Sequence, residues 1–152
     1  RGWAVLPVRR RTKRPLLNAW PDRATTDEKM IRDWFQRYRS AGLGVLAGLK
    51  SGIAVLDVER ENLDALQQWA ADREIPETLR IISGGGGVHY YFTIDRPFPK
   101  RKVEGIGDLQ GERSYVVAPP STHTTGNRYE FDFGHGFDTP VAPMPEWLRE
   151  DK

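Results

Sequence analysis

Short apolar or alternating runs, bounded by glycine, proline and charged residues, predict eight β-strands along the chain. They are expected at Trp3–Val8, Leu43–Ala47, Gly52–Val58, Leu79–Ile82, Val88–Ile94, Ile106–Gln110, Ser114–Ala118 and Arg128–Phe133. The first run contains Pro7, which has no N–H for a sheet ladder, so this strand is expected at a sheet edge. A serine and four glycines at 83–87 are expected to form the turn of a hairpin between the fourth and fifth strands.

Apolar positions three and four residues apart predict two helices among the early strands. Thr25, with Glu28 three residues later, has the spacing of a capping box that opens the first helix. The apolar face of this helix is expected to be core and comprises Met30, Ile31, Trp34, Phe35 and Tyr38. The second helix is expected to bury Leu63, Leu66, Trp69 and Ala70. Pro145–Arg149 is expected to start a short helix or to lead into another domain.

Helices early in the chain and strands late in it indicate an α+β fold with a mostly antiparallel sheet rather than a doubly wound parallel sheet. The 152 residues suffice for one hydrophobic core, so residues 1–152 are predicted to form a single domain. Because the sequence starts at Arg1 rather than Met, we expect a fragment of a longer protein.

Composition excludes several classes of chemistry. The chain has no cysteine, which excludes disulfide frameworks, thiol nucleophiles and cysteine zinc sites. No apolar run approaches the ~20 residues of a membrane span, and no signal peptide is visible, so no membrane partner is expected. The net charge of +2 is too small to indicate a nucleic-acid partner. Basic residues nevertheless cluster at 1–14, where there is no acid, and at 96–102, although a solvated surface explains either cluster equally well.

Carboxylates stand at the ends of two predicted strands. Asp57 and Glu59 are two residues apart at the end of an apolar strand, which places them on one face with Cβ atoms roughly 7 Å apart. Such a pair repels unless a cation lies between its members, and Mg²⁺ or Mn²⁺ prefers oxygen ligands of this kind. Asp108, in Ile106–Gln110, would complete a two-metal site if it converged on them. Strand ends exposed to solvent would explain the same residues.

Histidines give a second set of candidates. His89 follows the glycine run and lies on the strand face opposite Val88, Tyr90 and Phe92, where it would contact either a phosphate or water. The four glycines permit close approach of an anion to the backbone, but they match no Walker pattern, and a hairpin turn explains them as well. A further group, expected to face solvent while Tyr129, Phe131 and Phe133 face the core, comprises Glu130, Asp132, His135 and Asp138. Ser121 and His123 lie in a proline-rich turn without a nucleophile elbow.

The order of these motifs resembles the bifunctional DNA primase/polymerase domains, the prim-pol branch of the archaeo-eukaryotic primase superfamily. Residues 2–20 look like the opening of such domains, and SGIAVLDVE at 51–59 resembles their first catalytic motif, Asp-x-Asp or Asp-x-Glu. Residues 83–89 look like the second motif, in which a small polar residue and glycines lead to a histidine. Residues 106–121 look like the third, and the resemblance extends from Gly2 to about residue 133.

The resemblance implies an RNA-recognition-motif-like catalytic sheet beside a small N-terminal α/β unit. It implies DNA primase and DNA polymerase activity, a template-directed nucleotidyl transfer from nucleoside triphosphates to a primer on single-stranded DNA. Two divalent ions, Mg²⁺ or Mn²⁺, would be held by Asp57, Glu59 and Asp108. The residues implied to bind the nucleotide or the template are His89, Ser83, Tyr115, Lys13 and Arg14, with Tyr115 packing against the incoming sugar.

The resemblance also implies a setting and leaves alternatives open. Such domains commonly belong to cytoplasmic replication proteins of plasmids, phages and other mobile elements, fused to a helical domain and a helicase. Without cysteine, the zinc module of some relatives is not expected. Many relatives carry arginine or lysine among the glycines before the histidine, whereas here all four residues are glycine. A non-catalytic or initiation-only module that binds nucleotide and single-stranded DNA is therefore an alternative, and a metal-dependent nuclease is another.

Overall fold

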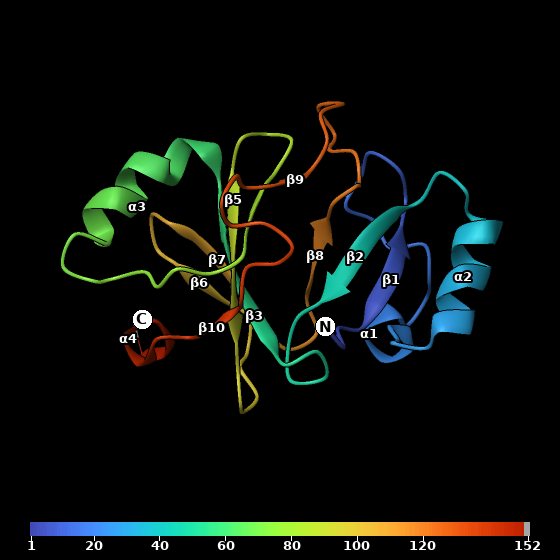
Figure 1. The fold of residues 1–152 in the computed structure, drawn as a ribbon, viewed down its shortest axis with the longest axis horizontal. Coiled ribbons are helices and arrows are strands. Elements are labelled where there is room, and N and C mark those ends of the chain that lie inside the picture. The colour runs from blue at the N-terminus through green and yellow to red at the C-terminus, as the bar shows by residue number, and fades with distance from the viewer. Residues whose placement is uncertain (151–152) are drawn as a thin grey trace.

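The computed structural model describes residues 1–150, which form two β-sheets with helices on their outer faces (Figure 1). In chain order the elements are β1 (Val5–Val8), α1 (Trp20–Arg23), α2 (Glu28–Arg37), β2 (Gly42–Leu46), β3 (Ile53–Val58), the 3₁₀ helix η1 (Arg60–Asn62), α3 (Leu63–Trp69), β4 (Arg80–Ile82), β5 (Val88–Thr93), β6 (Arg101–Val103), β7 (Gly107–Gln110), β8 (Tyr115–Ala118), β9 (Glu130–Phe131), β10 (Ala142–Pro143) and α4 (Glu146–Glu150). The predicted α+β class is confirmed. No helix within residues 1–150 is long and apolar enough to cross a bilayer.

The larger sheet has the strand order β6-β7-β3-β5-β4-β9. Its four central strands lie side by side in the order β7-β3-β5-β4. If these four are numbered by their order along the chain, the spatial order is 4-1-3-2, which is the order of an RNA-recognition-motif-like sheet. All of these strands pair antiparallel, and only β10 joins the sheet in parallel, alongside β5. The hairpin expected between β4 and β5 is confirmed, with Ile82 opposite Val88.

The smaller sheet has the order β1-β2-β8, and all of its pairs are antiparallel. Strand β1, which contains Pro7, lies at the edge of this sheet as predicted. Strand β8 comes directly after β7 in the chain, yet it leaves the larger sheet and pairs with β2. The sequence pattern predicted both strands but not this change of sheet. The small N-terminal unit is therefore completed by a strand from the second half of the chain.

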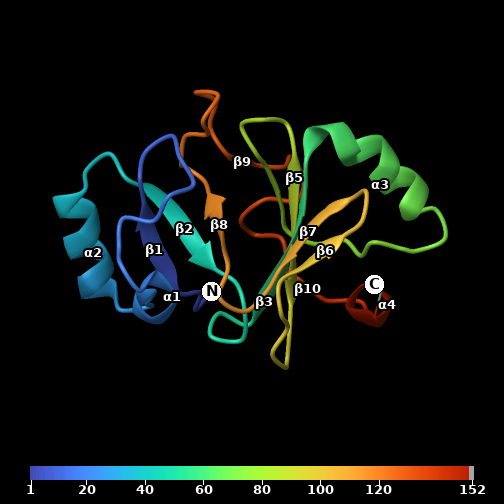
Figure 2. The same cartoon turned by 180° about the vertical axis from the view of Figure 1, so that it is seen from behind.

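The elements stack in four layers, which Figures 1 and 2 show from opposite sides: α2, the smaller sheet, the larger sheet, and then α3 with α4. One apolar core lies between the two sheets and joins residues such as Leu6 and Val116 to Val55 and Tyr91. A second core lies between the larger sheet and the helices α3 and α4. The side chains of β5 alternate between these cores, because neighbouring strand residues point to opposite faces.

Three local predictions are wrong. The cap of α2 is Asp27, whose carboxylate accepts the Met30 N–H, so the helix begins two residues later than the Thr25 capping box placed it. On the apolar face of α2 only Trp34 is buried, and Met30 is 45 % exposed. Strand β9 has only two residues, and Phe131 and Phe133 lie at the surface because the chain leaves the sheet after residue 131.

We predict that Gly107→Ala destabilises the protein by about 1–3 kcal/mol, the usual cost of overpacking. Gly107 lies in β7 opposite Val58, and a Cβ atom there would stand 2.0 Å from the Asp57 carbonyl oxygen of β3. The backbones of two paired strands would have to separate. Thermal unfolding measures the effect, with Gly136→Ala as the matched control, because a Cβ at Gly136 makes only ordinary contacts. Equal melting temperatures for the two variants would contradict the close approach of β3 and β7.

Candidate active site

Three polar side chains lie in a row across the middle of the larger sheet. Strand β3 pairs with β5 on one side and with β7 on the other, and the register places Asp57 opposite both His89 and Asp108. Residues opposite one another on paired strands point to the same face, so all three project toward the smaller sheet. This row is set by the pairing of three strands that are far apart in the chain.

Asp57 and His89 are joined by a side-chain hydrogen bond at the pocket wall. The distance from His89 Nε2 to Asp57 Oδ1 is 3.2 Å. The His89 side chain is 7 % exposed and the Asp57 side chain 17 %. Burial pushes the pKa of Asp57 upward, but the hydrogen bond and charge of His89 outweigh it, together with the charge of Lys13 and a hydrogen bond from Gln110. The net result is a pKa below the ordinary 3.8, so the carboxylate is ionised at neutral pH.

Asp57 and Asp108 are directly opposite one another in the register of β3 and β7. Carboxylates in this relation have Cβ atoms about 5 Å apart, and like charges placed so are destabilising unless a cation lies between them. Gln110, two residues further along β7, points to the same face and is buried. The close carboxylate pair is therefore Asp57 with Asp108 rather than Asp57 with Glu59.

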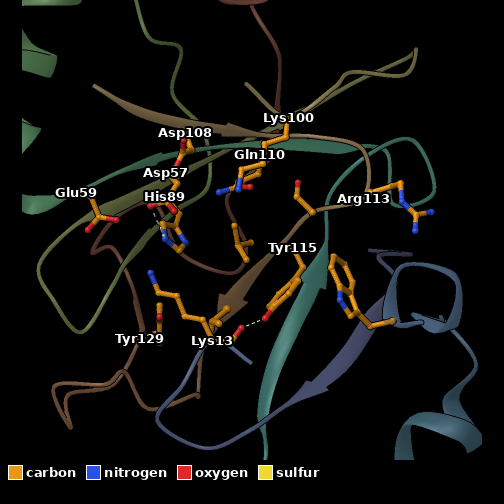
Figure 3. A pocket seen from close by; sticks show the side chains of 14 residues that line it. Lys13, Asp57, Glu59, His89, Lys100, Asp108, Gln110, Arg113, Tyr115 and Tyr129 are labelled. Carbon is orange, nitrogen blue, oxygen red and sulfur yellow. Dashed lines mark hydrogen bonds and ion pairs between the residues drawn. The ribbon is translucent and has the colours of Figure 1, made fainter. Parts of the chain in front are cut away.

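The row opens into a pocket of about 360 Å³ between the two sheets, which Figure 3 shows. Six of the eight predicted site residues line it: Lys13, Asp57, Glu59, His89, Asp108 and Tyr115. Two further cations, Lys100 and Arg113, also line it. The pocket thus combines three carboxylates with three basic side chains, an arrangement suited to a polyanion bound through cations.

Glu59 stands just beyond the end of β3 and is exposed. In Figure 3 its side chain lies apart from Asp57 and Asp108, at another part of the pocket wall. The glycine run at 84–87 packs against this end of β3. A Cβ at Gly87 would stand 2.5 Å from the Val58 carbonyl oxygen and 3.4 Å from the Glu59 Cα. The absence of a side chain at Gly87 thus allows the turn to lie against the acidic end of β3.

Ser83 and Arg14 do not line the pocket. The Ser83 hydroxyl accepts the Gly87 N–H at 3.0 Å, and the Ser83 carbonyl accepts the Gly86 N–H at 2.9 Å, so Ser83 holds the turn together. Arg14 is exposed, and its carbonyl accepts the Arg9 N–H at 2.8 Å, which closes the loop after β1.

Tyr115 and Lys13 contact one another at the pocket wall, on the side of the smaller sheet. The Tyr115 hydroxyl donates to the Lys13 carbonyl oxygen, and its ring packs edge-on against Trp20 with the centroids 4.8 Å apart. Burial raises the pKa of Tyr115. This contact holds the loop of Lys13 against β8, with the Lys13 side chain directed toward His89 (Figure 3).

Eight lining residues were not predicted as site residues, and four of them are polar residues that bear on the chemistry of the pocket: Lys100, Gln110, Arg113 and Tyr129. Gln110 could have been inferred from strand alternation with Asp108. Tyr129 was assigned to the core; it is indeed buried, and burial and nearby carboxylates raise its pKa to about 12. Lys100 was noted only as part of the basic cluster at 96–102, and Arg113 gave no local signal, because only the path of the chain between the sheets brings them to the pocket.

The other polar clusters have structural roles. His135 contacts Glu77 and Arg80, and the Arg80 Nε lies 3.2 Å from Asp132 Oδ2, so this network ties the 132–135 segment to β4. The Ser121 hydroxyl accepts the Leu43 N–H at 2.7 Å. None of these residues lines the pocket.

The residues of the pocket fit a divalent metal ion completed by a substrate. Within residues 1–150, no three His, Cys, Asp or Glu side chains are arranged to ligate one ion by themselves. Mg²⁺ is usually held by one or two carboxylates together with substrate phosphates, however, rather than by an all-protein cage. The opposed carboxylates of Asp57 and Asp108 offer such a partial set, and Glu59 lines the same pocket.

Comparison with protein families identifies the family of the chain. The model for the N-terminal domain of bifunctional DNA primase/polymerases matches residues 1–147. The chain belongs to this prim-pol family. No curated protein matches the chain. Membership in the prim-pol family indicates a nucleotidyltransferase of the primase/polymerase class, with DNA and nucleotides as substrates.

We predict that the pKa of Asp57 in the metal-free protein rises when His89 is replaced by alanine, because burial then acts without its main opponent. Since the folded-state pKa lies below the unfolded value, ionised Asp57 stabilises the fold above the unfolded pKa, and this contribution is lost as the pH falls through the folded pKa. Carboxyl NMR titration in EDTA measures both proteins. An unchanged Asp57 pKa in the variant would mean that His89 does not hold the carboxylate ionised.

Proposed function

We propose that this prim-pol domain performs template-directed nucleotidyl transfer, with the nucleotide bound in the pocket between the two sheets. The row of His89, Asp57 and Asp108 on the pocket wall is the observation that supports this most directly. It places two opposed carboxylates beside a histidine, inside a cavity that also has three basic side chains. Phosphoryl transfer depends mainly on positioning and charge, so this set of residues suffices without a covalent nucleophile.

Asp57, Asp108 and Glu59 are the proposed metal ligands. Bound Mg²⁺ or Mn²⁺ would lower the pKa of the primer 3′-hydroxyl and stabilise the charge of the leaving pyrophosphate. Asp57 is suited to this role because its low pKa keeps it ionised despite burial. The strand pairing holds Asp57 and Asp108 on rigid backbone, which limits the reorganisation needed when the substrate enters.

His89 is the proposed contact to the triphosphate. Its Nε2 faces Asp57, and its buried Nδ1 has no hydrogen-bond partner among the described residues. A substrate oxygen that reaches the ring would supply the missing partner. Tyr115 stands on the opposite wall, where its ring is positioned to pack against the sugar. Ser83 contributes indirectly, by holding the glycine turn.

The basic side chains that line the pocket favour a catalytic domain over a non-catalytic module in which glycines have replaced an essential basic residue. Gly84 and Gly87 leave no room for a side chain, because Cβ atoms there would stand 2.4 Å from His123 Cβ and 2.5 Å from the Val58 oxygen. A lysine or arginine at these positions is incompatible with the packing. Lys13, Lys100 and Arg113 reach the pocket from three other segments and are the proposed counterparts of the triphosphate charge.

We predict that Asp57→Ala and Asp108→Asn each abolish primer extension on a single-stranded template, tested with dNTPs and NTPs separately and with Mg²⁺ or Mn²⁺. Asp108→Asn removes one of two opposed negative charges, so in EDTA it is expected to unfold at an equal or higher temperature than the wild type. Asp57→Ala also removes the partner of His89, so it is expected to unfold at a lower temperature, but still cooperatively and above the assay temperature. Loss of activity would then not reflect loss of the fold.

Glu130→Gln is the matched control, because Glu130 is an exposed carboxylate outside the pocket. It is expected to extend primers at the wild-type rate. Normal extension by Asp57→Ala would refute the metal-site assignment. Triphosphate binding without extension in the wild type would favour the initiation-only module, and degradation of DNA without nucleotides would favour the nuclease.

His89→Ala is expected to raise the apparent KM for the nucleotide about tenfold or more, the usual cost of losing a hydrogen bond to a charged group. Steady-state extension at varied nucleotide concentration gives KM and kcat separately. His135→Ala serves as a control, because His135 lies outside the pocket. If His89→Ala leaves the KM unchanged, His89 does not bind the triphosphate.

A further inference from the structure

A second concave surface lies on the small lobe, by which we mean the smaller sheet with α1 and α2. It is located where α2 ends near the loop that follows β1. It is a groove of about 540 Å³. Its lining includes four arginines and two apolar or aromatic side chains, which we call the basic groove: Arg9, Arg10, Arg37, Arg39, Leu16 and Tyr38. No aspartate or glutamate of the described chain lines it. The groove is separate from the active-site pocket, with which it shares no residue.

The four arginines of the basic groove are not neutralised within the chain. None of them forms an ion pair with another of residues 1–150, whereas Arg96 pairs with Glu146 at 3.2 Å and Arg113 with Asp22 at 3.7 Å. The carboxyl end of α2 favours a cation at Arg37 through its dipole. That effect does not account for Arg9 and Arg10, which come from a different segment. Clustered, unpaired cations of this kind create a field that attracts a polyanion.

A smaller cavity of about 300 Å³ adjoins the basic groove and shares Arg10, Ser40 and Ala41 with it. We call it the side pocket. Its wall is largely apolar, formed by Phe35 of α2 with Leu43 and Pro120. An aromatic and apolar slot beside a row of cations is the combination that binds single strands, whose bases leave the stack while the phosphates lie on basic side chains. A duplex keeps its bases stacked and has no base to place there.

The basic groove and the active-site pocket are joined by one loop. Residues 9–14 present Lys13 to the active-site pocket and Arg10 to the basic groove. The Arg9 N–H donates to the Arg14 carbonyl at 2.8 Å, and Tyr115 holds the Lys13 carbonyl, so the loop is fixed between the two sites. A strand that leaves the active-site pocket past Lys13 would run along this loop toward the basic groove.

The second basic cluster of the sequence does not offer a comparable surface. Arg96 pairs with Glu146, and the Arg101 guanidinium donates to the Leu148 carbonyl oxygen, so both are tied to α4. Of the lysines in this cluster, Lys100 lines the active-site pocket itself. Of the two clusters, the first contributes Arg9 and Arg10 to a groove in which the arginines have no ion-pair partner among residues 1–150.

We propose that the basic groove and the side pocket bind single-stranded nucleic acid, with phosphates on the four arginines and one base in the side pocket. That the bound strand is the template rests on the proposed function, but the binding itself requires no catalysis. The test therefore uses fluorescence anisotropy of a labelled oligothymidylate in EDTA, without nucleotides.

Arg10→Gln combined with Arg39→Gln is expected to weaken binding about tenfold at low salt, and the slope of log K against log salt should fall by about 0.7 for each phosphate that the variant no longer neutralises. The matched control combines Arg23→Gln with Lys29→Gln, which removes the same charge from exposed residues of the same lobe outside the groove. The control is expected to bind as the wild type does. Equal weakening in both double variants, or in neither, would overturn the proposal.

The base in the side pocket has its own readout. The wild type is expected to bind oligothymidylate more tightly than an abasic strand of equal length, and Phe35→Leu is expected to reduce this difference while keeping apolar bulk. Polyglutamate, a polyanion without bases, is the competitor that tests for general anion binding. If it displaces the oligonucleotide as well as unlabelled oligothymidylate does, the groove is a general anion surface and the proposal is wrong.

Asp57→Ala separates this inference from the proposed function. This variant keeps the basic groove intact, so it is expected to bind the oligonucleotide with wild-type affinity while failing to extend a primer. Extension by Asp57→Ala would refute the metal site and leave the groove untouched. Loss of oligonucleotide binding in this variant would place the strand in the active-site pocket instead of the groove.

Discussion

The pairing of β3 with its two neighbours is the constraint on which the site depends. Strand β3 lies between β5 and β7, and the register on both sides places His89 and Asp108 opposite Asp57. A shift of one residue in either ladder would turn a whole set of side chains to the other face. The apolar cores on the two faces prevent such a shift, because Leu56 and Tyr91 must each stay buried on its own side. Packing thereby fixes the polar row.

The arrangement of side chains at the proposed site is energetically unfavourable. Two carboxylates stand opposite one another in the sheet, and a buried imidazole nitrogen has no partner among residues 1–150. Both features lower stability, and in the function that we propose a cation and a substrate oxygen would relieve them. The surrounding apolar residues, including Val55 and Leu109 with no exposed surface, stabilise the strands that hold this arrangement. Stability is supplied by the cores, and the pocket face is left for binding.

The crossing of β8 makes the small lobe part of the site. By leaving the larger sheet and pairing with β2, this strand carries Tyr115 to the pocket wall, where its hydroxyl holds the Lys13 loop. The same loop presents its arginines to the basic groove on the other side. One loop, fixed at one carbonyl, thus faces both the pocket of the prim-pol domain and the surface that we propose for a single strand.

Local periodicity was enough to predict most strands, the α+β class and the opposite faces of His89 and Tyr90, because alternation along a strand depends only on neighbouring residues. The motif order was enough to identify the prim-pol family, which the family match confirms. It did not indicate that Asp108 lies directly opposite Asp57 in the sheet, that β8 joins the small sheet, or that Lys100 and Arg113 reach the pocket. These features depend on contacts between residues distant in the chain. Such contacts are decided by burial of the two cores in three dimensions, and no local pattern encodes them.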